Sequence, residues 1–440
     1  MRHLTGILIF LLLLPLAADA QNRSGEGDVR ELYDQNCAGC HGDDLGGGSG
    51  SSLVDDEWIN GDSDEAIAAA IRDGNPDMGM PGFAGMLDEK QIRAMVIFIR
   101  EMNVKNRQAG LQQRLDGDVV SAAGEHYRLE EVGRGEGLLW SIDFMPGGTL
   151  LVTQRDGVLW HFDGDERTAI EGTPEVWQHG QGGLLEVALH PDYADNGWVY
   201  LSYSENTGAT ENGKEAGMTA VVRGRIVDGR WTDQERLFRA DGKHHTSSGA
   251  HYGSRFVFDD GYLFFGIGDR GRMDRSQDLD RPTGKIFRLH DDGRVPADNP
   301  FVDTPDALPE IWSYGHRNPQ GMDMDPSTGL LWEAEHGPRG GDEINLVEKG
   351  LNYGWPVITY GMNYNGTPIT DETHREGMEQ PKLHWTPSIA VAGIDFYEGD
   401  AFPGWTGKLL AGGLASEELH LLTVDDGSVT ADEIVLKDQG

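Results

Sequence analysis

The sequence has little positive charge, only two cysteines and no long apolar run beyond its N-terminus. It contains 36 lysines and arginines against 74 aspartates and glutamates, which gives a formal net charge of −38. Nucleic acid and anionic membrane surfaces are therefore poor partners, because binding to phosphate needs a basic patch. We interpret the acidity as a means of keeping an exported protein soluble.

The long apolar run lies at the start of the chain. Arg2 and His3 precede apolar residues from Leu4 to Leu16, and Ala18 and Ala20 are small residues near a plausible cleavage point. These features predict a secretory signal peptide at 1–20. A membrane anchor would need about 18 or more apolar residues, and this run is shorter. We therefore expect a periplasmic or secreted protein with no transmembrane segment once the signal is removed.

Both cysteines lie in the stretch Cys37-Ala-Gly-Cys40-His41. Two thiols separated by two residues, with a histidine directly after the second, are typical of c-type haem attachment. Cys37 and Cys40 bond the haem, and His41 ligates its iron. A zinc site would need two more ligands at matching spacing, and a disulfide would leave His41 unexplained. Export agrees with this interpretation, since c-type haem is attached where the chain has crossed a membrane.

A second iron ligand is expected on the downstream loop from Asp77 to Phe83. Met80 is the better candidate because Pro81 stiffens the loop directly after it. A thioether opposite a histidine raises the haem potential, which suits an electron acceptor. The order Met-Pro-x-Phe resembles the ligand loop of c-type cytochromes. Met78 stays open as an alternative ligand.

A helix is expected directly after this loop. Asp88 and Gln91 predict a capping box at its start. Four apolar residues follow at helical spacing: Ile92, Met95, Val96 and Ile99. This pattern predicts the closing helix of a small, all-α cytochrome c domain at 25–104, packed on an opening helix near 29–36. Polar and small residues without an apolar face then predict a linker at 105–124.

From residue 125 onward one unit recurs, made of a short apolar strand, a tight turn and a second apolar strand. Its five copies are spaced 45 to 72 residues apart and contain Ile142, Val187, Phe256, Met322 and Ile394. Such repeats are typical of β-propeller blades, so we expect 125–440 to be mainly β. A propeller joins its last blade to its first, yet the chain stops soon after the strand at 433–436. We therefore expect that a closing part beyond Gly440 is missing.

The loops between these strands carry glycine and polar clusters. They are Gly180-Gln-Gly-Gly-Leu-Leu185, His251-Tyr-Gly-Ser-Arg255, Gly266-Ile-Gly-Asp-Arg-Gly271, Gly315-His-Arg-Asn-Pro-Gln-Gly321, His336-Gly-Pro-Arg-Gly-Gly-Asp-Glu-Ile-Asn345 and Asn352-Tyr-Gly-Trp-Pro356. In this order they resemble the soluble quinoprotein glucose/sorbosone (aldose sugar) dehydrogenases over about 137–412. The resemblance implies a six-bladed β-propeller, incomplete here at its C-terminus, that uses pyrroloquinoline quinone (PQQ) and calcium.

The resemblance also implies roles in catalysis. His251 is the base that takes the hydroxyl proton, and an unperturbed histidine is partly neutral at pH 7. Asp269, an acidic residue beside this base, and Arg317 are the other catalytic residues. Gln181 is a cofactor-binding residue that also lines the sugar site.

Further roles concern the cofactors. Arg317 and Asn318 hold a carboxylate and an oxygen of the quinone, Arg317 through a bidentate fork. Gly337 and Pro338 offer calcium the backbone carbonyl oxygens that this ion accepts. Two positions depart from the family's pattern: Ala250 replaces an aspartate before the base, and Ala415 replaces a quinone-binding lysine. A later arginine-rich motif is expected beyond the last residue, so we expect the chain as written to bind quinone weakly.

The expected function is oxidation of an aldose to its lactone or acid. Electrons would pass singly to the fused haem and then to a downstream acceptor in the periplasm or respiratory chain. Two alternatives stay open. One is a propeller without quinone, beside a cytochrome c that transfers electrons independently. The other is a calcium-dependent hydrolase of the lactonase type, which would leave the haem without a use.

Overall fold

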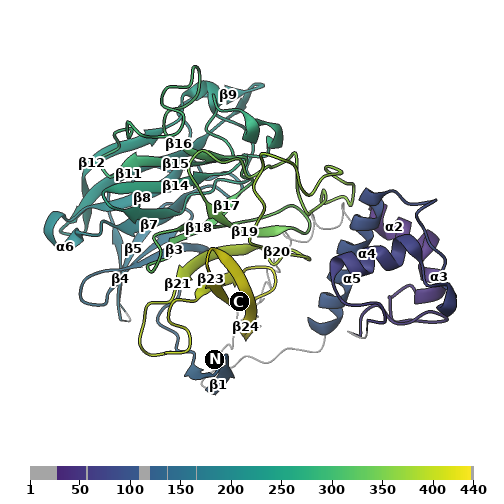
Figure 1. Cartoon of the computed structure of the whole chain (residues 1–440). Coiled ribbons are helices and arrows are strands. Elements are labelled where there is room, and N and C mark those ends of the chain that lie inside the picture. The colour runs from purple at the N-terminus through teal and green to yellow at the C-terminus, as the bar shows by residue number, and fades with distance from the viewer. Residues whose placement is uncertain (1–26, 56–57, 109–118, 136, 165, 438–440) are drawn as a thin grey trace, which may run out of the picture. The chain divides into compact units, whose positions relative to one another are not determined.

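The computed structural model describes residues 27–55, 58–108, 119–135, 137–164 and 166–437, so the predicted signal peptide lies outside the described residues. The chain forms two compact units (Figure 1). One comprises the chain up to Asn103 together with Met362–Pro368, and the other comprises Val104–Gly361 and Ile369–Gly440. None of the described helices combines the length and the apolar character that crossing a membrane requires.

The first unit is helical. Its elements are α2 (Gly27–Asn36), α3 (Ala38–His41), α4 (Asp64–Asp73), the 3-10 helix η1 (Pro76–Met78) and α5 (Glu89–Gln108). The predicted capping box is confirmed: the Gln91 N–H donates to Asp88 Oδ1 at 2.8 Å, and the Asp88 N–H donates to Gln91 Oε1 at 3.0 Å. These bonds satisfy two amides that have no backbone partner at the start of the helix, which fixes the start of α5.

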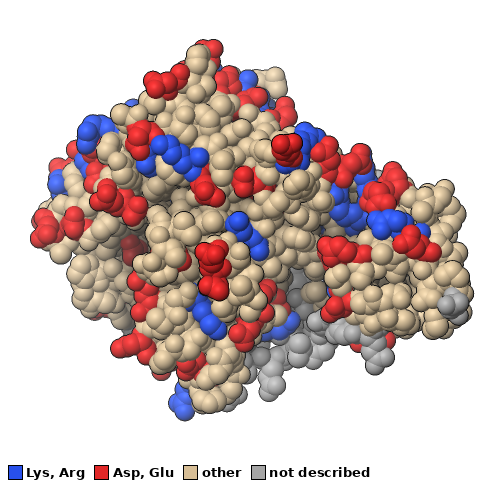
Figure 2. Space-filling view, viewed as in Figure 1, with Lys and Arg blue, Asp and Glu red and all other residues tan. Residues whose placement is uncertain are grey.

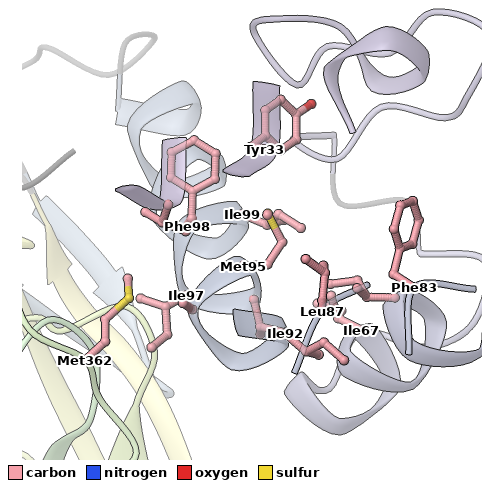
Figure 3. Close-up of a cluster of buried hydrophobic side chains, with 14 of the residues drawn as sticks. Tyr33, Ile67, Phe83, Leu87, Ile92, Met95, Ile97, Phe98, Ile99 and Met362 are labelled. Atoms are coloured by element: carbon pink, nitrogen blue, oxygen red, sulfur yellow. The ribbon is translucent and has the colours of Figure 1, made fainter. Parts of the chain in front are cut away.

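The apolar side of α5 forms the core of the helical unit (Figure 3). Ile92, Met95 and Ile99 are buried there, at the spacing that the sequence predicts. Phe98 meets Tyr33 of α2 with ring centroids 5.5 Å apart. The closing helix therefore packs on the opening helix, as predicted, and the apolar area removed from water stabilises the pair.

Part of the predicted linker has regular structure. No glycine or proline interrupts 89–108, so α5 continues through 105–108. Downstream, β1 (Val119–Ala122) pairs with β2 (Glu125–Arg128) as an antiparallel hairpin. Residues 109–118 lie outside the described residues.

The second unit contains five four-stranded antiparallel sheets (Figure 1), which we number as blades 1 to 5. Blade 1 is β3 (Leu139–Phe144), β4 (Leu150–Gln154), β5 (Val158–Asp163) and β6 (Glu166–Ile170); blade 2 is β7 (Leu184–Leu189), β8 (Val199–Glu205), β11 (Met218–Val227) and β12 (Arg230–Arg239); blade 3 is β13 (Phe256–Asp259), β14 (Tyr262–Ile267), β15 (Lys285–His290) and β16 (Ile311–Tyr314); blade 4 is β17 (Pro319–Met324), β18 (Leu331–Glu335), β19 (Asp342–Val347) and β20 (Leu383–Trp385); blade 5 is β21 (Val391–Phe396), β22 (Leu409–Gly413), β23 (Glu418–Asp425) and β24 (Ser428–Lys437). The small elements β9 (Thr210–Glu211), β10 (Lys214–Glu215), α6 (Tyr193–Asn196), η2 (Gly242–His244) and η3 (Met273–Gln277) lie in the connections.

The recurring units of the sequence are confirmed as blades. Each of the five predicted apolar centres lies in the first strand of a blade, and neighbouring first strands contact one another in chain order from β3 to β21. The prediction of six blades is wrong for the described residues, which contain five. The chain's own repeat indicates five units, and the sixth came only from the resemblance. Among the described strands β1 and β2 pair only with each other, so this hairpin adds no further four-stranded sheet.

The first strands of the blades line a cavity of about 1010 Å³. Two aspartates in its wall join neighbouring blades, and we call these contacts the aspartate latches. Asp143 Oδ2 of β3 accepts the Leu189 N–H of β7, and Asp323 Oδ2 of β17 accepts the Phe396 N–H of β21, both at 2.6 Å. The latches therefore tie blade 1 to blade 2 and blade 4 to blade 5.

A buried histidine in blade 5 predicts how stability depends on pH. His420 Nδ1 lies 2.7 Å from Asp432 Oδ1, and its Nε2 lies 3.5 Å from Glu418 Oε2. Burial acts to lower the pKa of this imidazole, but the two carboxylates raise it to about 9. The charged pairs therefore stabilise the fold fully below the ordinary histidine pKa, about 6.5, and this stabilisation is lost as the pH rises through about 9.

We expect His420→Gln to lower the free energy of unfolding at pH 6 by on the order of 3 kcal/mol, and by much less at pH 10. Urea denaturation of the wild type and the variant at both pH values measures this difference. A difference of the same size at pH 6 and pH 10 would contradict the role of the charged imidazole.

Candidate active site

The predicted site residues of the propeller lie at one end of its blades. Gln181 and His251 precede the first strands β7 and β13, Asp269 follows the second strand β14, and Arg317 precedes β17. Because neighbouring strands run antiparallel, the start of a first strand and the end of a second strand lie at the same edge of a blade. Loops far apart in the sequence therefore meet there.

His251 is held by two of the predicted residues. Its Nδ1 lies 2.6 Å from Asp269 Oδ1, and its backbone N–H donates to Gln181 Oε1 at 2.7 Å. An ionised carboxylate only accepts, so the ring donates from Nδ1 and leaves Nε2 with a free lone pair. The backbone at His251 has φ 56°, an uncommon value for a residue other than glycine. The loop thus fixes one orientation of the imidazole.

Asp269 is almost completely buried and fully hydrogen-bonded. Trp355 Nε1 donates to its Oδ2 at 2.8 Å, and the Gly271 N–H donates to Oδ1 at 2.7 Å. Burial acts to raise the pKa of this carboxyl, but the hydrogen bond from His251 and the charge of Arg317 bring it below the usual range. Asp269 therefore remains ionised at neutral pH and keeps the His251 ring in one tautomer.

The pKa of His251 is lowered from its ordinary value. Burial is the main cause and the positive charge of Arg317 the next, while Asp269 opposes both. The imidazole is therefore neutral at pH 7. Its side chain is still 14 % exposed, so Nε2 can act on a bound molecule.

Arg317 and Asn318 are fixed by their backbone as well as by their side chains. Both N–H groups donate to Glu335 Oε2, at 2.5 Å and 3.1 Å. Arg317 Nη1 donates to the His336 carbonyl at 2.7 Å, and Asn318 Oδ1 accepts the Gly253 N–H at 3.3 Å. Glycine is needed beside them, since a Cβ at Gly268 would lie 2.6 Å from the His251 carbonyl oxygen and 2.9 Å from that of Arg317.

The turn at Gly337 and Pro338 directly follows His336, whose carbonyl oxygen bonds Arg317. A Cβ at Gly337 would lie 2.0 Å from the Gly341 carbonyl oxygen, so only glycine fits this turn. The Gly337 N–H donates to Asp342 Oδ1 at 2.8 Å, and the Pro338 carbonyl accepts from Ser388 Oγ at 2.9 Å. These hydrogen bonds hold the turn next to the Arg317 loop.

Three residues of this site had no predicted role: Trp355, Glu335 and His336. Trp355 lies 86 residues from its partner Asp269, and no spacing rule joins them. His336 Nε2 is buried and has no hydrogen-bond partner among the described residues. The motifs that contain His336 and Trp355 were visible in the sequence, but their contacts depend on the fold.

The helical unit contains a second site. A cavity of about 420 Å³ is lined by Cys37, Cys40, His41 and Met80, together with apolar side chains of α4 and α5. His41 Nδ1 lies 2.8 Å from the Ser51 carbonyl oxygen, so Nδ1 carries the proton and Nε2 is available as a ligand.

The two methionines of the predicted ligand loop differ in exposure. Met78 is 65 % exposed, whereas Met80 is half-buried against the core of the helical unit. Met80 also exchanges two backbone hydrogen bonds with Asn75, at 2.9 Å and 3.0 Å, which fix its position in the loop.

Comparison with known proteins gives matches for both units. The family model described as Glucose / Sorbosone dehydrogenase matches residues 138–440, and the model described as Cytochrome C oxidase, cbb3-type, subunit III matches residues 26–99. The chain is 45 % identical over 309 residues to the aldose sugar dehydrogenase YliI of Escherichia coli (strain K12), an alignment that covers 68 % of this chain and 81 % of that protein.

Comparison with solved structures agrees with these matches. The soluble aldose sugar dehydrogenase of Escherichia coli in its apo-form has a TM-score of 0.64 at 44 % identity, covering 68 % of this chain and 87 % of that one. The PQQ-bound aldose sugar dehydrogenase of Streptomyces coelicolor has a TM-score of 0.57 at 27 % identity, covering 74 % of this chain and 88 % of that one.

Proposed function

Because the chain belongs to the glucose/sorbosone dehydrogenase family, we propose that it oxidises a hydroxyl group of an aldose with PQQ as the electron acceptor. The reaction would give the lactone or acid. The observation that carries this proposal is the hydrogen-bonded pair of His251 and Asp269, held against Gln181 and Arg317 on loops at one end of the propeller. The related enzymes described above support the substrate class.

In the proposed reaction His251 acts as the general base. Its Nε2 takes the proton of the sugar hydroxyl while the Nδ1–H stays bonded to Asp269. The ionised carboxylate stabilises the imidazolium that forms, and Trp355 keeps that carboxylate in place. Gln181 Oε1 accepts the His251 backbone N–H and so positions the base. In the proposed reaction Gln181 would also contact the bound molecule.

The residues present fit PQQ. When bound, this cofactor supplies the two-electron acceptor for the hydride that leaves the sugar carbon. Arg317 offers a buried positive charge for an anionic oxygen, and Asn318 offers an amide. The buried His336 Nε2 without a partner among the described residues is a further polar atom to which such a ligand can bond.

The Gly337–Pro338 turn fits calcium. This ion binds oxygen ligands, including backbone carbonyls, and it would supply positive charge beside the quinone. The Pro338 carbonyl accepts one bond from Ser388 and keeps a second lone pair. Asp342 Oδ1 accepts the Gly337 N–H and so holds the turn in place.

The cavity of the helical unit fits a c-type haem. Cys37 and Cys40 would carry the two thioether bonds, His41 and Met80 would ligate the iron, and the haem would supply a one-electron carrier. Donor and acceptor on one chain have a high effective concentration for each other. The haem would pass its electrons to an acceptor outside the cell's cytoplasm, since the predicted signal peptide at 1–20 supports export to the periplasm or beyond.

Haem reduction tests the proposed function. The full chain, loaded with calcium, is mixed with PQQ, with an aldose or with both, and the haem absorption is followed. We expect reduction only when PQQ and aldose are both present. Reduction in none of the three mixtures would favour a propeller that only binds, and hydrolysis of an added lactone without any change in the haem absorption would favour a hydrolase.

The two methionines give a prediction for the haem. Met80→Ala should remove the charge-transfer band of a methionine–iron bond and lower the haem potential, because the thioether raises that potential. Met78→Ala is the matched control and should change neither, since Met78 is largely exposed. Optical spectra and redox titration of both variants decide, and the reverse pattern would assign Met78 as the ligand.

A further inference from the structure

Arg270 lies directly after Asp269 in the turn that follows β14, and the proposed reaction gives it no role. Its side chain is 0 % exposed. An arginine is rarely fully buried unless it is paired, because its charge then loses the hydration that water provides. The described hydrogen-bond acceptors of Arg270 are two backbone carbonyls, and no carboxylate is among them. The position of this charge therefore depends on the two peptide groups that it binds.

The guanidinium of Arg270 binds the loop that carries the proposed base, residues 247–251, which we call the His251 loop. Arg270 Nη2 donates to the Ser248 carbonyl at 2.7 Å, and Arg270 Nη1 donates to the Ala250 carbonyl. The guanidinium also lies over the Tyr252 ring, with its Cζ 3.3 Å from the ring centroid. One side chain therefore holds the residues on both sides of His251.

The His251 loop needs support because the backbone at His251 is left-handed, with φ 56°. In a residue other than glycine such a conformation persists only where the surrounding contacts impose it. Gln181 supplies two of these contacts, since its backbone N–H donates to the Gly249 carbonyl and its Oε1 accepts the His251 N–H, both at 2.7 Å. With the bonds from Arg270, the three successive carbonyls of residues 248, 249 and 250 are all bound.

The turn of Asp269 and Arg270 acts on the base in two ways. Asp269 Oδ1 lies 2.6 Å from His251 Nδ1 and holds the ring, whereas Arg270 holds the backbone before it. The turn packs closely on the His251 loop, because a Cβ at Gly271 would lie 2.7 Å from Ser248 Oγ. Ring and backbone of the base are therefore fixed by two adjacent residues.

The positive charge of Arg270 also acts on the base. Burial is the main cause of the lowered pKa of His251; the charges of Arg317 and Arg270 act in the same direction, and Asp269 opposes them. Burial lowers the pKa of Arg270 as well, but a guanidinium keeps its proton at neutral pH. His336 is the other ionisable neighbour, and its pKa of about 3, lowered by burial, leaves it uncharged at neutral pH.

We propose that Arg270 is a positioning residue of the active site, which holds the His251 loop by two carbonyl groups and places a positive charge near the base. A guanidinium suits this task, because its planar fork donates two bonds in a fixed geometry while one face stacks on an aromatic ring. Arg270 is fully buried, so it acts through the loop and not by touching a substrate. Only its effect on turnover rests on the proposed function.

Hydrogen exchange tests the hold on the loop without quinone or sugar. Exchange of the backbone amides at 247–251 is followed by mass spectrometry of the full chain. We expect Arg270→Met to exchange there about tenfold faster or more, the factor that corresponds to a lost charge-assisted hydrogen bond. The matched control is Arg294→Met, which removes an exposed arginine and should exchange as the wild type does. Wild-type exchange in Arg270→Met would overturn the proposal.

Arg270→Lys is the second variant, in case Arg270→Met does not fold. A lysine keeps the positive charge but lacks the fork that binds two carbonyls. The amides at 247–251 should therefore exchange faster than in the wild type in this variant too. Exchange at the wild-type rate in Arg270→Lys would likewise overturn the hold on the loop.

Titration of His251 tests the charge. The full chain with isotope-labelled histidine, reduced with dithionite and free of quinone and sugar, is followed by NMR from acid to neutral pH. The His251 signal is assigned by its absence in His251→Gln. Arg270→Met should raise the pKa of His251, because a positive charge that lowers it is removed, whereas Arg270→Lys should leave it near the wild-type value. An unchanged pKa in Arg270→Met, or an equal rise in both variants, would overturn the role of the charge.

Kinetics with PQQ and an aldose link the loop to turnover. Arg270→Met should lower kcat by about tenfold or more and change KM little, since a misplaced base slows the reaction without removing a contact to the substrate. Wild-type kcat together with faster exchange would make Arg270 a structural residue only and would overturn the proposal. If the wild type itself oxidises no aldose, the proposed function fails, while exchange and titration still decide the role of Arg270.

Discussion

His251→Ala is expected to lower turnover by about 10²-fold or more, the usual scale for loss of a general base. The imidazole has its Nδ1–H bonded to Asp269 and its Nε2 available, and no other described side chain hydrogen-bonds to Asp269 Oδ1. Quinone affinity should change little, because Arg317 and Asn318 are held by Glu335 and not by this side chain. Steady-state kinetics with an aldose and calorimetric titration with PQQ measure the two effects separately.

His126→Ala is the matched control, since it removes an exposed imidazole on the β1–β2 hairpin. Its turnover should equal that of the wild type. Wild-type turnover in His251→Ala as well would refute the role of the base. In the wild type, kcat/KM should fall on the acid side only at a pH below the ordinary histidine pKa, because burial and Arg317 lower the pKa of His251.

Asp269→Asn separates positioning from proton transfer. The carboxylate raises the pKa of His251 against the other causes, so its removal should move the acid limb of kcat/KM to still lower pH. Turnover should fall as well, because an amide does not hold the imidazole in one tautomer. An acid limb that moves to higher pH would contradict the contact seen between the two side chains.

Arg255→Met is expected to lower the free energy of unfolding of the propeller by about 3 kcal/mol, the lower end of the range for breaking a buried ion pair. Arg255 Nη1 lies 2.6 Å from Glu186 Oε2, and its Nε donates to the Gln320 carbonyl at 2.6 Å. One side chain therefore joins blades 2, 3 and 4. Burial raises the pKa of Glu186 and Arg255 opposes this, so the variant leaves a carboxylate that is costly to ionise.

The double variant Arg255→Met/Glu186→Leu supplies the control. Replacing both partners with apolar groups removes the uncompensated charge, so most of the lost stability should return. Urea denaturation followed by tryptophan fluorescence gives the three values. A double variant as unstable as Arg255→Met would show that packing, and not the buried charge, causes the loss.

The local features of the fold were readable from the sequence. Asp88 and Gln91 act within one turn of helix, and the apolar residues of α5 repeat at the helical period, so short-range rules suffice. The blades were recognised for the same reason: each strand-turn-strand unit is local. The number of blades does not follow from local sequence. Its prediction came from the resemblance, which implied six blades, whereas the described residues form five.

The active site divides in the same way. His251, Asp269, Gln181 and Arg317 were placed by the order of their motifs, and the structure brings them together through hydrogen bonds. Glu335 lies in a strand whose sequence, apart from its charged residues, indicates buried β structure. Its contact with the Arg317 loop depends on how the end of its strand packs against the start of the neighbouring strand. The spacing of residues in the sequence does not predict this packing.

The aspartate latches couple the stability of neighbouring blades. In an array of repeats each unit touches only its neighbours, so stability is a sum of terms for the units and for their borders. A hydrogen bond to an ionised carboxylate strengthens a border, and Asp323 supplies one between blades 4 and 5. Local opening of blade 5 must release the Phe396 amide from blade 4. Slow hydrogen exchange at this amide would therefore report a cooperative unit of two blades and not the fraying of one edge.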